Sequence, residues 1–132
     1  MKLSTRSRYG TRALVHIAKN GDSPMRGETM AEEEGISKKY LDSILMQLRK
    51  AALLKSFRGP GGGYLLAQSP CDISMADIVR AMEGTLSLVP CVENPSICKK
   101  SKDCHARKLW CSLTEKMEQC LSELTLADVA EL

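Results

Sequence analysis

Residues 35–50 read GISKKYLDSILMQLRK, and this stretch decides the fold of the 132-residue chain. Ser37 is a good helix N-cap, and leucine and isoleucine recur after it at helical spacing up to Lys50. A short acidic helix is expected just before it, over residues 27–34, with Gly35 as its C-terminal end. A short helix, a glycine turn and a serine-capped second helix form the helix-turn-helix pattern.

The segments on either side of this helix pair extend the pattern. An amphipathic helix is predicted over residues 5–20. After the pair, two short apolar runs, residues 53–57 and 64–67, flank the loop RGPGGG and predict a β-hairpin. A capping box that begins at Ser74 opens a further helix, which Gly84 closes. The first half of the chain is therefore expected to form a helix-turn-helix head with a two-stranded wing.

The second half of the chain is expected to hold a long loop and a long helix. Residues 85–103 show no periodicity, contain three cysteines, and carry Pro90 and Pro95, which exclude a continuous helix; a loop of this length is usually functional or disordered. From His105, apolar residues follow heptad spacing: Ala106, Trp110, Leu113, Met117, Cys120 and Leu124, widened by Leu109 and Leu121. Such a stripe can dock on its own domain, but the head already has a core, so we expect a partner chain to cover part of it. The predicted fold class is mainly α, a winged helix-turn-helix head followed by a long C-terminal dimerisation helix.

Charge and composition restrict the partners. Residues 1–67 hold 12 Lys and Arg against 6 Asp and Glu, whereas residues 68–132 hold 7 against 10. The basic half favours a polyanionic partner, although a solvated basic face has the same composition. No apolar run reaches the roughly 18 residues of a membrane helix, and the start lacks an apolar signal core, so we expect a cytoplasmic protein without a membrane partner. In a cytosol, the six cysteines favour metal binding or buried thiols over disulfides.

Four motifs make the chain resemble bacterial transcriptional regulators of the IscR/NsrR type, the Rrf2 family of winged-helix iron–sulfur regulators. They are residues 1–10 (MKLSTRSRYG), 35–41 (GISKKYL), 58–66 (RGPGGGYLL) and the three-cysteine loop. The resemblance covers nearly the whole chain and implies a DNA-binding repressor that acts as a homodimer. Its two winged heads would bind an imperfect palindrome in double-stranded DNA, with half-sites roughly 34–36 Å apart.

The resemblance divides the chain into three parts. Residues 1–84 form the winged helix-turn-helix DNA-binding domain, residues 85–104 the cysteine-bearing sensor loop, and residues 105–132 the dimerisation helix and tail.

The start of the second helix and the wing carry the predicted DNA contacts. Lysines and hydroxyls there can bind phosphates or purine edges, and a carboxylate can accept from a cytosine amino group. An arginine at the wing tip suits the minor groove, and the glycines bring the backbone close to DNA. The alternative is a solvated helix face with a serine that only caps; a P-loop is discounted because no Lys-Ser/Thr pair follows the glycines. The predicted DNA-binding residues are Ser37, Lys38, Lys39, Tyr40, Asp42, Arg58 and Gly59.

The three loop cysteines are the predicted metal ligands. Cys91, Cys98 and Cys104 are separated by six and five residues, so their thiolates can converge. The resemblance implies that they hold an iron–sulfur cluster, 2Fe-2S or 4Fe-4S, whose state adjusts DNA affinity. Zinc is an alternative cofactor, and a cluster-free thiol or metabolite-responsive loop is another.

The chain departs from the family at the cysteine spacing and at the fourth ligand. Family members usually have five residues between the first two cysteines, where this chain has six. The usual histidine, three positions after the third cysteine, is replaced by Arg107, and the acidic ligand of the partner's first helix falls on Arg8. The fourth ligand is therefore open between His105, Glu93, Asp103 and a group from the partner chain.

Enzyme activity is the hypothesis from a different class. Cys104 and His105 are adjacent, but neighbouring residues seldom face each other as nucleophile and base, and no acid is placed to orient the imidazole. We therefore expect no catalytic residues.

Overall fold

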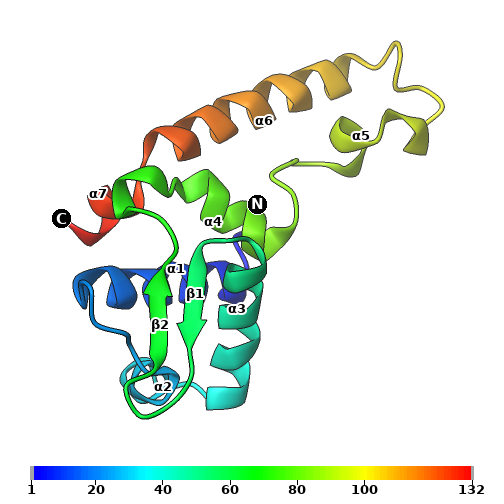
Figure 1. The fold of residues 1–132 in the computed structure, drawn as a ribbon. Coiled ribbons are helices and arrows are strands. Elements are labelled where there is room, and N and C mark those ends of the chain that lie inside the picture. The colour runs from blue at the N-terminus through cyan, green and yellow to red at the C-terminus, as the bar shows by residue number, and fades with distance from the viewer. Residues whose placement is uncertain (1, 132) are drawn as a thin grey trace.

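The computed structural model describes residues 2–131, and Met1 of the opening motif and Leu132 lie outside this range (Figure 1). The elements in chain order are α1 (Thr5–Lys19), α2 (Gly27–Glu34), α3 (Lys38–Lys50), β1 (Leu54–Phe57), β2 (Gly63–Leu66), η1 (Pro70–Asp72), α4 (Met75–Glu83), α5 (Pro90–Glu93), η2 (Pro95–Ile97), α6 (His105–Glu123) and α7 (Leu126–Ala130). The two η elements are single 3₁₀ turns. The strands β1 and β2 pair antiparallel, so the predicted mainly α fold with a two-stranded wing is confirmed.

Capping residues set the boundaries of the helix pair α2–α3. Gly35 has φ 65° and ψ 32°, a left-handed conformation that ends α2 and that an L side chain rarely adopts. The hydroxyl of Ser37 accepts a hydrogen bond from the backbone N–H of Tyr40 at 3.1 Å and begins α3. The predicted glycine turn and serine cap are therefore both present.

One apolar core joins the helices of the head. Its fully buried large side chains come from α1, α2, α3, α4, α7 and the segment just before α4, and they are Leu14, Ile17, Met30, Leu41, Ile44, Leu45, Leu48, Ile73, Ile78 and Leu126. Because α3 contributes four of them, the core is the main determinant of its orientation. No helix among residues 2–131 has the length and apolar character needed to cross a membrane.

Helix α7 returns the end of the chain to the head (Figure 1). Leu126 and Ala130 are buried in the same core, and α7 contacts α1 and η1. Thr125 and Asp128 form a capping box at its start. The sequence predicts only a tail here, although the capping-box residues are the same type of N-terminal signature that correctly predicted α4.

Helix α6 extends away from the head and carries the cysteine-bearing segment at its far end (Figure 1). Near the head, Met117 and Leu121 of α6 pack against Ala76 and Val79 of α4. The segment 85–103 is not wholly a loop, because it contains the short helix α5 and the turn η2, each of which begins at a proline. A proline is tolerated at the first position of a helix, because the N–H that it lacks would have no acceptor within the helix.

Candidate nucleic-acid interface

The core directs one face of α3 outward. Leu41, Ile44, Leu45 and Leu48 are fully buried. Since an α-helix has 3.6 residues per turn, residues 39, 46 and 50 lie on the opposite face, and residues 38 and 42 lie on one side of it. The predicted residues Ser37, Lys38 and Lys39 are exposed, which leaves the start of α3 free to meet a ligand.

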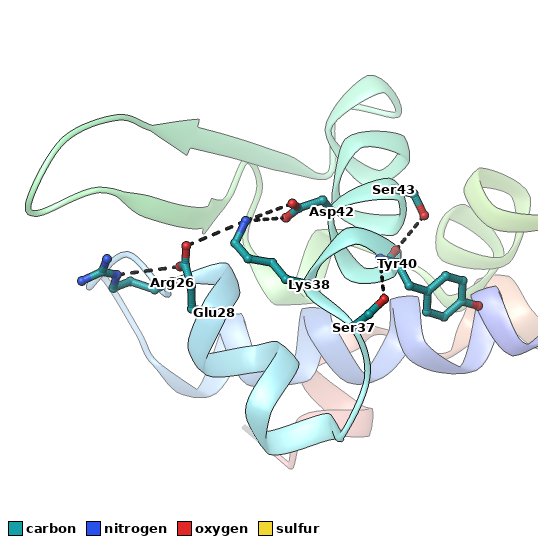
Figure 2. A network of polar contacts seen from close by, with 7 residues as sticks. All are labelled: Arg26, Glu28, Ser37, Lys38, Tyr40, Asp42 and Ser43. Atoms are coloured by element: carbon teal, nitrogen blue, oxygen red, sulfur yellow. Dashed lines mark hydrogen bonds and ion pairs between the residues drawn. The ribbon is translucent and has the colours of Figure 1, made fainter.

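Lys38 and Asp42, both predicted to contact DNA, are paired with each other (Figure 2). The Nζ atom of Lys38 lies 2.9 Å from Oδ2 of Asp42 and 3.8 Å from Oε1 of Glu28 on α2. Arg26 extends the network, with its Nε atom 3.9 Å from Oε2 of Glu28. The hydrogen bond with Asp42 raises the pKa of Lys38 above its ordinary value. Two carboxylates therefore partly neutralise Lys38 in the free chain.

Tyr40 points away from this network and toward α1 (Figure 2). Its ring packs edge-on against the ring of Tyr9, with centroids 6.1 Å apart and planes at 87°. Its backbone carbonyl accepts a hydrogen bond from Ser43 at 2.6 Å. The ring of Tyr40 thus helps to position α3 against α1, and a DNA contact by this residue stays a prediction.

The wing is tied to α3 and has an exposed tip. Arg58 and Gly59 are both exposed, and Gly59 has φ 98°, which favours glycine. A Cβ atom at Gly62 would collide with the backbone at the end of β1, so this turn excludes a side chain there. The Nη1 atom of Arg49, near the end of α3, donates to the Ser56 hydroxyl of β1 at 3.1 Å. Helix and wing are therefore held together as one surface.

Arg6 of α1 also supports α3, although it is not among the site residues predicted from the sequence. Its guanidinium donates to Oε1 of Gln47 at 2.5 Å and to the carbonyl of Ser43 at 3.5 Å. The partners are separated by 41 and 37 positions, so no local pattern could have predicted these contacts.

The three loop cysteines lie on different local elements. Cys91 is in α5, Cys98 follows η2, and Cys104 is the N-cap of α6, where its Sγ atom accepts from the backbone N–H of Arg107 at 3.4 Å. The Nε atom of Arg107 donates to the carbonyl of Cys91 at 2.8 Å. Arg107, which occupies the position of the usual family histidine, therefore connects α6 to α5.

The donor chemistry of this loop suits an iron–sulfur cluster or zinc, but the side chains are not gathered. Thiolates are the usual ligands of both. Within residues 2–131, no three His, Cys, Asp or Glu side chains lie close enough together to hold a metal ion, and this includes the candidate fourth ligands Glu93, Asp103 and His105. All six cysteines are free thiols, with Cys98 exposed and Cys91 and Cys104 half-buried. Metal binding therefore requires the loop to rearrange.

Comparison with known proteins identifies the family of this winged-helix chain. The family model Rrf2, described as an iron-dependent transcriptional regulator, matches residues 3–132. The chain belongs to the Rrf2 family. Protein rrf2 of Nitratidesulfovibrio vulgaris is 41% identical over 130 residues, which cover 98% of this chain and 87% of the relative.

Solved structures of two regulators are also similar to this Rrf2-family chain. The global cysteine regulator CymR of B. subtilis is 34% identical, with a TM-score of 0.80 over 99% of this chain and 97% of CymR. The IscR protein of T. potens is 34% identical, with a TM-score of 0.79 over 99% of this chain and 87% of IscR. The predicted family is therefore confirmed, and the chain is a DNA-binding transcriptional regulator rather than an enzyme.

Proposed function

We propose that this regulator is a homodimeric repressor that binds an imperfect palindrome in double-stranded DNA through α3 and the wing. The observation that carries the proposal is the surface formed by the exposed start of α3 and the exposed Arg58, joined by the bond from Arg49 to Ser56. A helix at this place fits the major groove while the wing arginine reaches the adjacent minor groove. Lys38 and Lys39 would then supply phosphate or base contacts.

The exposed face of α6 supports the homodimer. Leu109, Trp110 and Leu113 are 53%, 36% and 40% exposed, although all three are large apolar side chains. Met117 and Leu121, further along the same helix, are partly buried against α4. A second copy of α6 would remove the first three residues from water and place two winged heads on one two-fold axis.

We further propose that Cys91, Cys98 and Cys104 together hold an iron–sulfur cluster that sets DNA affinity. When bound, such a cluster supplies sensitivity to oxidants. Because Cys104 is the N-cap of α6, gathering the three thiolates would pull the loop toward the end of the dimer helix, and releasing them would let the two heads change their relative setting.

A cluster-free thiol switch is the second candidate. The exposed Cys98 thiol and the ungathered ligands favour it, as does the similarity to CymR, which is described as a global cysteine regulator. Zinc on the same cysteines would instead give a structural clamp without a redox response.

Anaerobic purification followed by iron, zinc and acid-labile sulfide analysis tests the three candidates. We expect iron and sulfide, and a visible absorption that is lost when any one of the three loop cysteines is replaced by alanine. A coupling of about 1–3 kcal/mol would also change DNA affinity by 5–150-fold in each variant. Cys71→Ala and Cys111→Ala are the matched controls and should change neither.

Other outcomes of this test reject the cluster. Stoichiometric zinc without sulfide would identify the clamp. A metal-free protein whose DNA affinity still depends on Cys98 would identify the thiol switch. If all three loop variants bind DNA like the unmodified chain, the sensor proposal is wrong and only the DNA-binding regulator remains.

A further inference from the structure

An apolar side chain lies on the outward face of α3. Met46 is 46% exposed. At 100° per residue, it lies about 150° around the helix axis from the mean direction of the four buried residues of α3. Met46 therefore projects almost directly away from the core, and this is the direction from which DNA would approach if the proposed function is correct.

Cations lie on both sides of Met46. On a helical projection, Lys38 and Arg49 fall on one side, and Lys39 and Lys50 fall on the other. A helix in the major groove has a phosphate backbone on each side and the base edges in front. Lys39 and Lys50 lie about 20° and 40° from Met46 on one side, and Arg49 and Lys38 lie about 60° and 80° from it on the other, so cations on either side can meet phosphates while Met46 faces the base edges.

The two residues between the cations have different chemistry. Asp42 lies one turn before Met46 on the same strip, and its carboxylate can only accept hydrogen bonds when ionised. Met46 has no hydrogen bond to offer a base, but its side chain is flexible and polarisable. The one apolar group on the floor of the major groove is the C5 methyl of thymine.

We propose that Met46 determines specificity by contacting a thymine C5 methyl group in each half-site. The inference rests on the proposed function, because it requires α3 to enter the major groove. In this arrangement Asp42 selects a base with an exposed amino group, and Met46 selects a thymine further along the same groove. A lone exposed methionine needs no explanation in general, but one that lies among cations on the outward face of a recognition helix is placed to meet the apolar group of a base.

The test removes only the C5 methyl group of single thymines in the DNA. A duplex is first selected from a randomised pool with the unmodified chain, and each thymine is then replaced in turn by deoxyuridine, at both half-sites together. We expect one symmetric pair of positions to weaken binding by about fourfold per half-site, which is what burial of one methyl group contributes. Met46→Ala should bind the thymine and deoxyuridine duplexes equally.

The control variant is Val129→Ala, which shortens another exposed apolar side chain, on α7. It should keep the full preference for thymine. Met46 makes little contact with the core, so Met46→Ala should also keep the thermal unfolding midpoint of the unmodified chain. The inference is overturned if no thymine position is sensitive to deoxyuridine, or if Met46→Ala retains the same preference. If the pool yields no preferred duplex, the proposed DNA interface fails as well; a preferred duplex without methyl dependence overturns only the role of Met46.

Discussion

In the free chain, the Nζ atom of Lys38 lies 2.9 Å from Oδ2 of Asp42, one helical turn further along α3. Both residues lie on the surface proposed to face DNA. To bind a phosphate, Lys38 must leave a carboxylate that already neutralises it. This pair therefore restrains non-specific binding to DNA, where phosphate contacts supply nearly all of the affinity.

Asp42→Asn should tighten binding to unrelated duplex DNA, because it removes a negative charge and releases Lys38. The plot of log Kd against log salt concentration should become steeper by about one unit per protomer, as expected for one more phosphate contact. Fluorescence anisotropy over a series of KCl concentrations measures both effects. An unchanged slope would show that the pair does not restrain Lys38.

Arg58→Ala and Lys39→Ala should weaken DNA binding in different ways. Loss of a wing arginine from a groove should cost about 1–3 kcal/mol at the preferred site. Loss of a phosphate-binding lysine should weaken specific and unrelated duplexes alike and reduce the salt slope by about one per protomer. Lys108→Ala, on α6 far from the head, is the charge-matched control. Unchanged gel-shift affinity for both variants would remove these residues from the interface.

Leu113→Asp should dissociate the dimer without unfolding the chain. Leu113 is exposed in the single chain, so a charge there is tolerated in the monomer but becomes an unpaired buried ion in the dimer. Met117→Asp should instead loosen α6 from α4, because Met117 already packs against Ala76 and Val79. Sedimentation velocity at micromolar concentration, with circular dichroism, separates the two effects. A stable monomer for the unmodified chain would contradict the proposed dimer.

Glu83 should stabilise the head at neutral pH but not in acid. Hydrogen bonds from the side chains of Ser4 and Ser7 and from the backbone N–H of Ser4 lower the pKa of Glu83. A carboxylate with a lowered folded pKa contributes stability above its unfolded pKa, and this contribution is lost as the pH falls through the folded value. Glu83→Gln should therefore cost on the order of 1 kcal/mol at pH 7, since the carboxylate is exposed. Thermal unfolding measured at a series of pH values from 7 downward checks this, because the difference between the two proteins should shrink as the pH falls, and a difference that does not depend on pH would have another cause.

Local signals explain which parts of the fold could be predicted from the sequence. Gly35 and Ser37 act through their own backbone and their near neighbours, so the helix pair was predicted with its boundaries nearly correct. The five residues of α7 are too few for a periodic pattern, and only the capping box at Thr125 marks them. The docking of α7 on α1 depends on packing between opposite ends of the chain, and a local sequence pattern cannot predict such packing.

The candidate site was predictable in its residue types but not in its contacts. The sequence placed Lys38 and Asp42 on one helix face, yet it did not show that Glu28 of α2 also approaches Lys38. The spacing of the cysteines allows their thiolates to converge, but it does not show that Cys104 caps α6 and that Arg107 joins α6 to α5. Spacing restricts the reach of a loop, whereas its conformation depends on contacts made across it.

The central claim, that two linked winged heads bind a palindrome through α3 and the wing, is tested most directly by selecting duplexes from a randomised pool with the unmodified chain and sequencing those retained. The prediction is an imperfect palindrome whose half-sites have centres about 10–10.5 base pairs apart or a multiple of that spacing, with enrichment greatly reduced for Arg58→Ala and for Leu113→Asp. A pool without an enriched sequence, or one enriched for a single unrepeated half-site, would contradict it.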